Sequence, residues 1–357
     1  MFRLDPAIHR RILLVRLSAL GDVVYALPAL TALHRRCPDA RIAWAVEEAS
    51  ADLLRGHPFI DQLIAVPRKD WQARLRRGRV LSAARGVLAF RRELRAGKFD
   101  LAIDLQGNLR GALVAAASGA PARAGFAPPG SREHSHLLLT DRVAVDPRVH
   151  RVERNLRLLE AIGVPAGADA AGVLPPTSES DHAAADALLR GLPPGAAFVL
   201  LHPGVSRFGS FKQWPAASWT ALARLLREGG LSVALSAGPG EEGLAGQIAG
   251  EAGGVLVAAG LKLPALAELI RRAAVFVGAD TGPTQMAWML GTPTVALMGP
   301  KDAAIYGPLG DAHRKLTADV PCRPCTRRSC ADNLCMKKIA VEQVLEAAIS
   351  AAKTRRL

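Results

Sequence analysis

The feature of this sequence that most constrains its fold is a regular alternation of short apolar runs with segments whose apolar residues recur at helical spacing. RILLVRL at 11–17 ends in the loop SALGD, and the helical pattern that follows stops at Pro38. Further apolar runs lie at 41–46, 62–67 and 99–106. Such alternation predicts a parallel sheet with helices on both faces. We expect the intervening helices at about 23–37, 48–56, 70–96 and 107–118.

A second series of the same kind begins after a stretch rich in Pro, Gly, Ala and Ser. This stretch, at 161–195, interrupts the alternation and predicts a domain boundary near 170–180. With 357 residues, the chain is also longer than a single core usually becomes. We expect one domain at 1–172, a second at 173–338, and a C-terminal helix at 339–357, for which packing back on the first domain is one alternative. The strands expected in the second domain are 197–204, 231–239, 254–260, 274–280 and 292–299.

Composition excludes several classes of protein. Aromatic residues make up only 4% of the chain although half of it is hydrophobic, so the core must be aliphatic, as suits helices packed on parallel strands. No apolar run approaches the roughly 20 residues that cross a bilayer. The N-terminus also lacks the apolar region and small-residue cleavage site of a signal peptide. We therefore expect a cytoplasmic protein.

The chain is basic, with 46 Lys and Arg against 32 Asp and Glu and a formal net charge of +14. An Arg-rich genome would explain part of this excess, but residues 68–95 concentrate it, with nine Arg and one Lys against one Asp and one Glu. A clustered charge of this kind predicts an anionic partner. Nucleic acid is poorly supported, because aromatic and basic residues do not interleave. An anionic membrane surface is a further candidate, with Trp71 and Phe90 among the apolar residues that would face it.

Polar residues that follow predicted strands are the candidates for chemistry, because ligands of open α/β sheets bind at the carboxyl ends of the strands. In the first such loop, Gly21 permits a tight turn and Asp22 precedes a helix expected to start near Val23. Asp is a favoured N-cap, so a capping role for Asp22 is one interpretation. The other is a general base at the mouth of an interdomain cleft, where the carboxylate would take a proton from an attacking hydroxyl.

Two loops of the second domain have the features of a phosphate site. Asp280, Thr281 and Gly282 follow a predicted strand and open a helix, whose free backbone N–H groups would seat a diphosphate, although a simple capped turn is the alternative. This turn has neither the GxGxxG nor the GxxxxGK[ST] pattern, so it does not indicate a dinucleotide or P-loop site. Lys212 lies in the loop HPGVSRFGSFKQWP, where its ammonium could neutralise phosphate oxygens unless it is an ordinary surface lysine.

Four of the five cysteines lie close together in the sequence, at Cys322, Cys325, Cys330 and Cys335. Cysteine is a zinc ligand, but the spacing is not that of a paired CxxC ribbon. A structural zinc or a redox-sensitive cluster is one interpretation, and plain reduced thiols, which the cytoplasm favours, are the other. Cys37 precedes a proline at the end of a predicted helix and is expected to be inert.

Taken together, these loops resemble the signatures of the ADP-heptose:lipopolysaccharide heptosyltransferases, glycosyltransferase family 9, and among them the heptosyltransferase I group. The resemblance rests on ILLVRLSALGDVVYALPALTAL, FDLAIDLQGNLRGAL, SREHSHLL, HRVERNLRLL, HPG…FKQWP and GADTGP, which occur in this order. It covers essentially the whole chain and implies an α/β fold of the GT-B type, with two Rossmann-like, doubly wound domains facing a central cleft. The acceptor would bind the first domain and the sugar nucleotide the second.

The resemblance also implies roles for individual residues. Asp22 matches the catalytic base, and Lys212 matches the lysine at the donor phosphates. On the donor side, the matching positions are Ser206, Glu241 or Glu242, Asp280, Thr281, Gly282 and Gln285. On the acceptor side, they are Ser18, Gly21, Arg68, Gln106, Arg110 and Arg132. The implied reaction is inverting transfer of heptose from ADP-L-glycero-D-manno-heptose to the Kdo and inner-core region of lipopolysaccharide, with no metal and no cofactor.

One region departs from the family pattern. Gln285 stands where the family usually has His after the DTG turn, and Trp288 replaces a small residue. Gln can hydrogen-bond a phosphate or a sugar hydroxyl but carries no charge, so another nucleotide sugar is an alternative donor. A sugar-nucleotide epimerase of the same fold, which needs no lipid acceptor, is a second class of enzyme. An anionic lipopolysaccharide precursor would account for a basic first domain and would bring the enzyme to the cytoplasmic face of the inner membrane.

Overall fold

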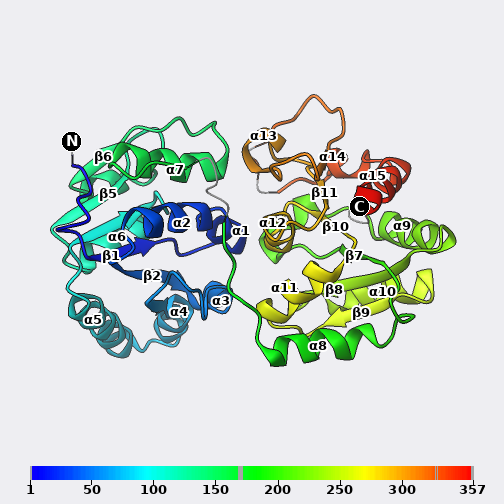
Figure 1. Ribbon diagram of the computed structural model, residues 1–357, viewed down its shortest axis with the longest axis horizontal. Helices are drawn as coiled ribbons and strands as arrows, with labels where there is room; N and C mark the ends of the chain where they lie inside the picture. The colour runs from blue at the N-terminus through cyan, green and yellow to red at the C-terminus, as the bar shows by residue number, and fades with distance from the viewer. Residues whose placement is uncertain (1, 168–171, 326, 328, 355–357) are drawn as a thin grey trace. The chain divides into compact units, whose positions relative to one another are not determined.

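The computed structural model describes residues 2–167, 172–325, 327 and 329–354. The chain divides into two compact units, Met1–Pro176 and Thr177–Leu357, which we call unit 1 and unit 2 (Figure 1). Each unit is built on one six-stranded sheet, and every strand pair within the two sheets is parallel. The predicted α/β architecture of two doubly wound domains is confirmed.

In unit 1 the strand order is β3-β2-β1-β4-β5-β6. The strands are β1 (Arg11–Val15), β2 (Arg41–Glu47), β3 (Gln62–Val66), β4 (Leu101–Asp104), β5 (Ala122–Phe126) and β6 (Asp141–Val143). The helices are α1 (Leu20–Val24), α2 (Leu27–Arg36), α3 (Glu48–Ala51), α4 (Arg68–Arg76), α5 (Val80–Ala96), α6 (Leu109–Ala117), the 3-10 turn η1 (Ser135–Leu138) and α7 (Arg151–Ala161). Strands β1 and β4 run through the middle of the sheet, and from Ile12 and Leu101 onward their residues are fully buried. This burial explains why both strands are continuous apolar runs in the sequence.

In unit 2 the strand order is β12-β11-β10-β7-β8-β9. The strands are β7 (Phe198–His202), β8 (Ser232–Ala237), β9 (Leu256–Ala259), β10 (Val275–Ala279), β11 (Thr294–Leu297) and β12 (Arg314–Leu316). The helices are α8 (Glu179–Leu189), the 3-10 turn η2 (Arg207–Lys212), α9 (Ala216–Glu228), α10 (Glu242–Ala252), α11 (Leu263–Arg272), α12 (Gly282–Met289), α13 (Ala303–Tyr306), α14 (Leu334–Lys337) and α15 (Val341–Thr354). Two tryptophans, Trp214 and Trp219, are fully buried in its core and pack edge to face.

The two sheets share one topology, because the first strand of each unit lies between the second and the fourth. The strand order therefore reverses between β1 and β4 in unit 1, and between β7 and β10 in unit 2. At such switch points the loops after neighbouring strands turn to opposite faces of the sheet and leave a crevice for a ligand. The fold thus directs attention to the residues that follow these four strands.

Three expected helices differ in the structure. The basic segment predicted as one helix at 70–96 is two helices, α4 and α5, separated around Gly78, whose φ of 69° an L side chain rarely adopts. The helix expected at 48–56 ends after one turn, at Ala51. The helix expected from Val23 begins at Leu20 and is interrupted after Val24, so that α1 and α2 replace it.

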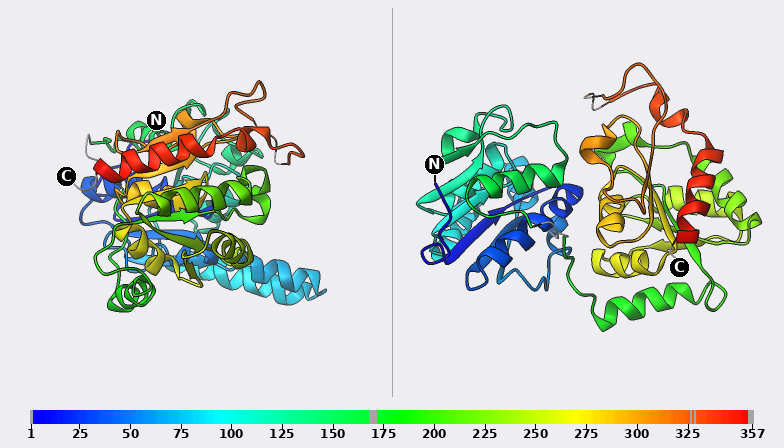
Figure 2. Two further views of the ribbon diagram at one scale, coloured as in Figure 1. Left: turned by 90° about the vertical axis from the view of Figure 1, so that its right-hand side faces the viewer. Right: turned by 45° about the horizontal axis from the view of Figure 1, so that its top comes forward.

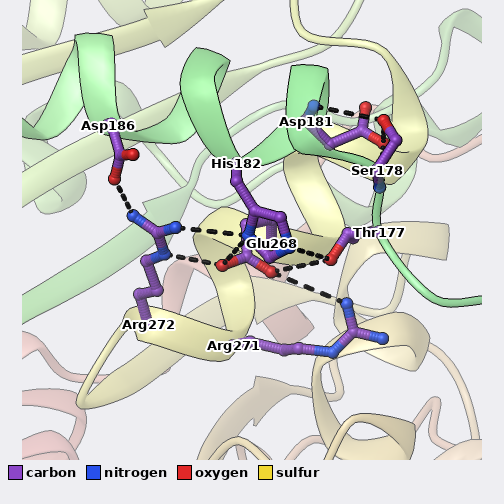
Figure 3. Close-up of polar contacts among 8 residues, drawn as sticks. All are labelled: Thr177, Ser178, Asp181, His182, Asp186, Glu268, Arg271 and Arg272. Carbon is purple, nitrogen blue, oxygen red and sulfur yellow. Dashed lines mark hydrogen bonds and ion pairs between the residues drawn. The ribbon is translucent and has the colours of Figure 1, made fainter.

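A set of polar contacts, which we call the α8–α11 clasp, holds the first helix of unit 2 on α11 (Figure 3). Glu268 is its centre, and its carboxylate accepts hydrogen bonds from Thr177 Oγ1 at 3.1 Å and from Arg272 Nε at 2.6 Å. His182 Nδ1 lies 3.0 Å from the same carboxylate, and Arg272 also pairs with Asp186. Burial opposes ionisation of Glu268, but these hydrogen bonds outweigh it and lower the pKa of Glu268.

The C-terminal helix α15, drawn in red in Figures 1 and 2, packs beside α9 and against β10, β11 and β12. Its buried residues Val344, Ala348 and Ala351 belong to the core of unit 2. The apolar face of α15 is therefore buried within unit 2, and it is not the face that would pack back on the first domain. Within the described residues, no helix combines the length and the apolar character needed to cross a membrane.

Candidate functional site

The loop after β1 presents Asp22 from the first turn of α1. Ala19 is the N-cap and Asp22 the third helical residue, so Asp22 is not the N-cap but does have a capping role, because its side chain binds the N-cap N–H. Its carboxylate turns back to accept the Ala19 N–H at 3.4 Å and forms an ion pair with Arg16 Nη2 at 2.8 Å. The side chain is 35% exposed, which leaves the carboxylate accessible. An accessible carboxylate with a fixed cation beside it can act as a proton acceptor.

Arg16 and Gln106 hold this loop from the two sides of the switch point in unit 1. Arg16 is buried and donates from Nη1 to the carbonyl oxygen of Leu105, directly after β4. Gln106 Oε1 in turn accepts the backbone N–H groups of Leu17 at 2.9 Å and Ser18 at 3.4 Å. Gln106 and Ser18 were expected on the acceptor side, whereas Arg16 was not among the expected site residues. The available signal was an arginine immediately after a buried apolar strand.

Asp104, the last residue of β4, is fully buried beneath the same loop. Its Oδ1 accepts the N–H groups of Gln106 at 2.9 Å and Gly107 at 3.3 Å. Burial raises the pKa of Asp104 to about 6, although these hydrogen bonds and the charges of Arg16 and Arg154 oppose the shift. Arg154 is also buried, and desolvation followed by repulsion from neighbouring arginines lowers its pKa to about 9. Sequence reasoning did not identify either residue as part of the site.

Two of the predicted acceptor residues, Arg68 and Arg110, meet at one carboxylate. Glu47, the last residue of β2, accepts two hydrogen bonds from Arg68, from Nε at 2.7 Å and from Nη2 at 2.9 Å. Arg110 Nη1 reaches the same carboxylate at 3.1 Å. The hydrogen bond to Glu47 raises the pKa of Arg68. Glu47 is a buried acid that the sequence analysis missed, and two guanidinium groups around it leave a net positive charge.

The remaining predicted acceptor residues lie at the same edge of the sheet. Gly21 is the second residue of α1. Arg132 is exposed, and its backbone N–H donates to the carbonyl oxygen of Gly107 at 3.0 Å, which places it beside the Gln106 loop.

In unit 2, Lys212 and Asp280 join the loops after β7 and β10. Lys212 Nζ donates to Asp280 Oδ2 at 2.5 Å and to the Asp280 carbonyl oxygen at 2.8 Å. Gln285 Nε2 donates to the other carboxylate oxygen, Oδ1, at 3.0 Å. The Lys212 side chain is only 18% exposed, so Lys212 is not an ordinary surface lysine. Asp280 is therefore held between Lys212 and Gln285, and it fixes the ammonium group at the switch point.

The turn after β10 opens α12, and no side chain caps the backbone N–H groups of its first turn, where Pro283 has none to offer. Thr281 is the N-cap by position, but its side chain makes no capping hydrogen bond, and Gly282 is the first helical residue. Thr281 Oγ1 lies 3.4 Å from Thr284 Oγ1, which donates to the carbonyl oxygen of Ala279 at 2.5 Å. An N-terminal helix end with uncapped donors, next to a lysine ammonium, can bind an anion.

Glu241 lies at the carboxyl end of β8, next to β7. Its Oε2 accepts the Gly238 N–H at 2.8 Å and lies 3.7 Å from Nε2 of the buried His202. Burial lowers the pKa of His202, although the Glu241 charge opposes the shift. Of the two candidate carboxylates, Glu241 is turned toward the ends of β7 and β8 and Glu242 is exposed. Ser206 is also exposed and begins the turn η2.

The described part of the cysteine segment shows no metal-binding arrangement. Among the described residues, no three His, Cys, Asp or Glu side chains gather in a way that could hold a metal ion. Cys322 and Cys330 are exposed, Cys335 is buried, and all four cysteines of the segment are free thiols. Burial raises the pKa of Cys335, with a smaller contribution from Cys322 and Cys330. The described residues therefore offer no ligand set for a structural zinc site.

Comparisons with known proteins agree on one family. The model of Glycosyltransferase family 9 (heptosyltransferase) matches residues 87–335. Lipopolysaccharide heptosyltransferase 1 of Pseudomonas aeruginosa is 32% identical over 323 residues, which cover 90% of this chain and 87% of that protein.

Solved structures agree on the fold. A glycosyl transferase family 9 structure from Veillonella parvula superposes with a TM-score of 0.84 at 24% identity, covering 99% of both chains. The structure of E. coli heptosyltransferase WaaC with ADP-2-deoxy-2-fluoro heptose superposes with a TM-score of 0.72 at 26% identity, covering 94% of this chain and 99% of that one. The GT-B fold expected from the sequence is confirmed.

Proposed function

The chain belongs to glycosyltransferase family 9, and we propose that it transfers heptose from ADP-L-glycero-D-manno-heptose to the Kdo region of the lipopolysaccharide inner core, with inversion at the anomeric carbon. The observation that carries the proposal is the Lys212–Asp280 pair at the switch point of unit 2, beside the uncapped start of α12. The relatives' names, lipopolysaccharide heptosyltransferase 1 among them, support the choice of donor sugar and acceptor.

The donor half of the reaction follows from the charges in unit 2. As the bond to the sugar breaks, positive charge grows on the anomeric carbon and negative charge on the leaving diphosphate. The Lys212 ammonium, fixed by Asp280, and the N–H groups at the start of α12 would stabilise that developing negative charge. Glu241 would accept hydrogen bonds from ribose hydroxyls. Gln285, by donating to Asp280, would orient the Lys212–Asp280 pair.

The acceptor half follows from unit 1. Asp22 would remove the proton from the attacking hydroxyl, and Arg16 keeps its carboxylate in place. Attack from the face opposite the leaving diphosphate inverts the anomeric centre in a single displacement, and this scheme routes no step through a metal ion. Arg68, Arg110 and Arg132 would bind the carboxylate and phosphate groups of the lipid precursor.

We extend the proposal to the membrane that carries such an acceptor. The α4–α5 hairpin exposes five large apolar side chains, between 45% and 76% of their surface, at Leu75, Val80, Leu81, Val87 and Leu88. Exposed arginines accompany them at Arg76, Arg77, Arg79, Arg85, Arg91 and Arg92. A surface that combines exposed apolar side chains with arginines can bind an anionic bilayer. Phe90 does not face the membrane, because it lies in the core, and the ring of the half-buried Trp71 packs on it.

Vesicle co-sedimentation tests the membrane surface. Wild type should sediment with anionic vesicles and much less with zwitterionic ones, and Leu81→Asp should release it. Leu309→Asp, at an exposed leucine of unit 2, is the matched control and should sediment like wild type. Equal sedimentation of wild type with both kinds of vesicle would rule out this surface.

A panel of nucleotide sugars tests the reaction. ADP-heptose should raise the melting temperature more than GDP- or UDP-sugars, and incubation with a Kdo-bearing lipid precursor should yield a product heavier by one heptose. The anomeric configuration of that product, read by NMR, checks inversion. Isomerised sugar nucleotide formed without any acceptor would point to an epimerase instead.

A further inference from the structure

Asp104 is the buried titratable group for which the reaction scheme has no role. It ends β4 and pairs in register with Val15, the last residue of β1, so it lies directly under the Asp22 loop. One carboxylate oxygen accepts two backbone N–H groups, whereas Oδ2 is buried and has no hydrogen-bond partner among the described residues. A buried carboxylate with an unsatisfied oxygen is costly, which implies that its charge is compensated by other means.

Two buried arginines provide that compensation. Arg16 and Arg154 are each 6% exposed, and each has a buried Nε–H without a hydrogen-bond partner among the described residues. The charges of both favour ionisation of Asp104. Arg154 is fixed from other directions, because its guanidinium lies 3.9 Å from the centre of the Phe126 ring and donates to the Gly130 carbonyl oxygen. Arg16 is the arginine that reaches from this cluster to Asp22.

Glycines next to Asp104 and Arg154 leave room for these two side chains. A Cβ atom at Gly111 would lie 2.4 Å from Asp104 Oδ1, and one at Gly125 would lie 3.2 Å from Asp104 Cβ. At Gly107, whose φ is 67°, a Cβ would lie 3.1 Å from Arg154 Nη2. Glycine at three positions, on α6, β5 and the loop after β4, leaves room for a charged cluster where side chains would exclude it.

We propose that Asp104 is a positioning residue, whose negative charge fixes Arg16 and Gln106 and, through them, the loop that presents Asp22. One route runs through Gln106, whose N–H binds Asp104 and whose side chain binds the N–H groups of Leu17 and Ser18. The other runs through Arg16, which pairs with Asp22. This inference rests on the proposed role of Asp22 as the base.

The charge of the cluster changes within an accessible pH range. The groups that face Asp104 are Arg16, directly after β1, and Arg154 from α7. Asp22 on α1, Arg132 after β5 and Arg151 at the start of α7 lie farther out and act on Arg154. Above about pH 6, the ionised Asp104 offsets one of the arginine charges of this cluster. Below that pH, Asp104 takes up a proton, its hydrogen bonds weaken, and one arginine charge is left unbalanced. Turnover should therefore fall as the pH drops through about 6.

Asp104→Asn tests this, because asparagine keeps the size and one acceptor oxygen but removes the charge. We expect kcat near neutral pH to fall about 10-fold, the donor KM to stay unchanged, and the decline of turnover near pH 6 to disappear. Asp100→Asn is the matched control, since Asp100 also accepts two backbone N–H groups, from Arg10 and Arg11, but at the opposite end of β4. It should keep the wild-type pH profile. An Asp104→Asn enzyme that retains the decline near pH 6 overturns the proposal.

A second measurement does not depend on turnover. The ¹⁵N–¹H signal of Arg16 Nε, assigned by its loss in Arg16→Lys, should shift as the pH passes through about 6 in wild type and stay constant in Asp104→Asn. A signal that titrates identically in both proteins refutes the link between Asp104 and Arg16. If wild type turns over no nucleotide sugar, the proposed function fails, and this titration still decides whether Asp104 controls Arg16.

Discussion

Replacing Gly204 by alanine should displace the carboxylate of Glu241 while leaving the fold in place. A Cβ atom at Gly204 would lie 2.0 Å from Glu241 Oε2 and 2.2 Å from its carboxyl carbon. Ordinary contacts between such atoms are about 3.5 Å or longer, so one of the two groups must move by more than about 1 Å. The carboxylate is the group that moves, because it ends a flexible side chain whereas the new methyl group is attached to the backbone.

The size of the effect follows from the contacts that Glu241 would lose. Its hydrogen bond to the Gly238 N–H, at 2.8 Å, involves a charged acceptor and is worth about 1.5–3 kcal/mol. If the carboxylate in its present position also binds the ribose, ADP loses one hydrogen bond to it, which is again worth about 1.5–3 kcal/mol. That loss raises the ADP dissociation constant about 10- to 100-fold. The free energy of unfolding should fall by about 1–2 kcal/mol, because alanine restricts the unfolded chain and offsets part of the lost hydrogen bond.

Isothermal titration with ADP measures this effect. Gly246→Ala is the matched control, because it lies on α10, the helix that Glu241 precedes, and has nothing within 4 Å of the added Cβ. It should bind ADP like wild type and be more stable by about 0.5–1 kcal/mol. If Gly204→Ala binds ADP as tightly as Gly246→Ala, Glu241 does not contact the donor and our reasoning is refuted.

Two further predictions concern Asp22 and the α8–α11 clasp. Asp22→Asn should lower turnover about 100-fold while ADP affinity, measured by titration calorimetry, stays unchanged, and near-normal turnover would exclude Asp22 as the base. Glu268→Gln should lower the free energy of unfolding by about 2 kcal/mol at neutral pH, as followed by urea denaturation. Since the pKa of Glu268 is lowered in the folded state, the carboxylate contributes fully above the unfolded value of about 4.3 and loses its contribution as the pH falls through the folded pKa. The difference between Glu268→Gln and wild type should therefore shrink in acid, and a difference that does not vary with pH would contradict the clasp.

Most strands could be predicted from the sequence, including the edge strands β3 and β9, but β5, β6 and β12 could not. Strands β1 and β10 are unbroken apolar runs because helices cover both faces of their sheets. Strand β5 reads ARAGF, and the edge strands β6 and β12 have three residues each, which is too little apolar pattern to distinguish the three from loops. Helix α8 was also missed, because the Pro and Gly around it masked the Ser178–Asp181 capping box, which did signal a helix start.

The candidate site was predictable where a residue belongs to a recognisable motif that follows a strand, as Asp22, Lys212 and Asp280 do. It was not predictable where the partner comes from another part of the chain. Glu47 is 21 residues from Arg68, and nothing in the local pattern joins them. The stretch GPGEEG after β8 does have GxGxxG spacing, which was not noticed, but there Glu241 itself occupies the Gly238 N–H that such a loop would offer to a phosphate.

The two unusual residues of α12 are joined by a hydrogen bond. Trp288 Nε1 donates to Gln285 Oε1 at 2.5 Å, which turns the Gln285 amide so that its NH₂ group faces Asp280. A histidine at position 285 could not both accept from the indole and donate to Asp280 unless its ring were neutral and oriented to reach both. Gln285 and Trp288 are therefore coupled: replacing one without the other would disrupt the support of the Lys212 ammonium by Asp280.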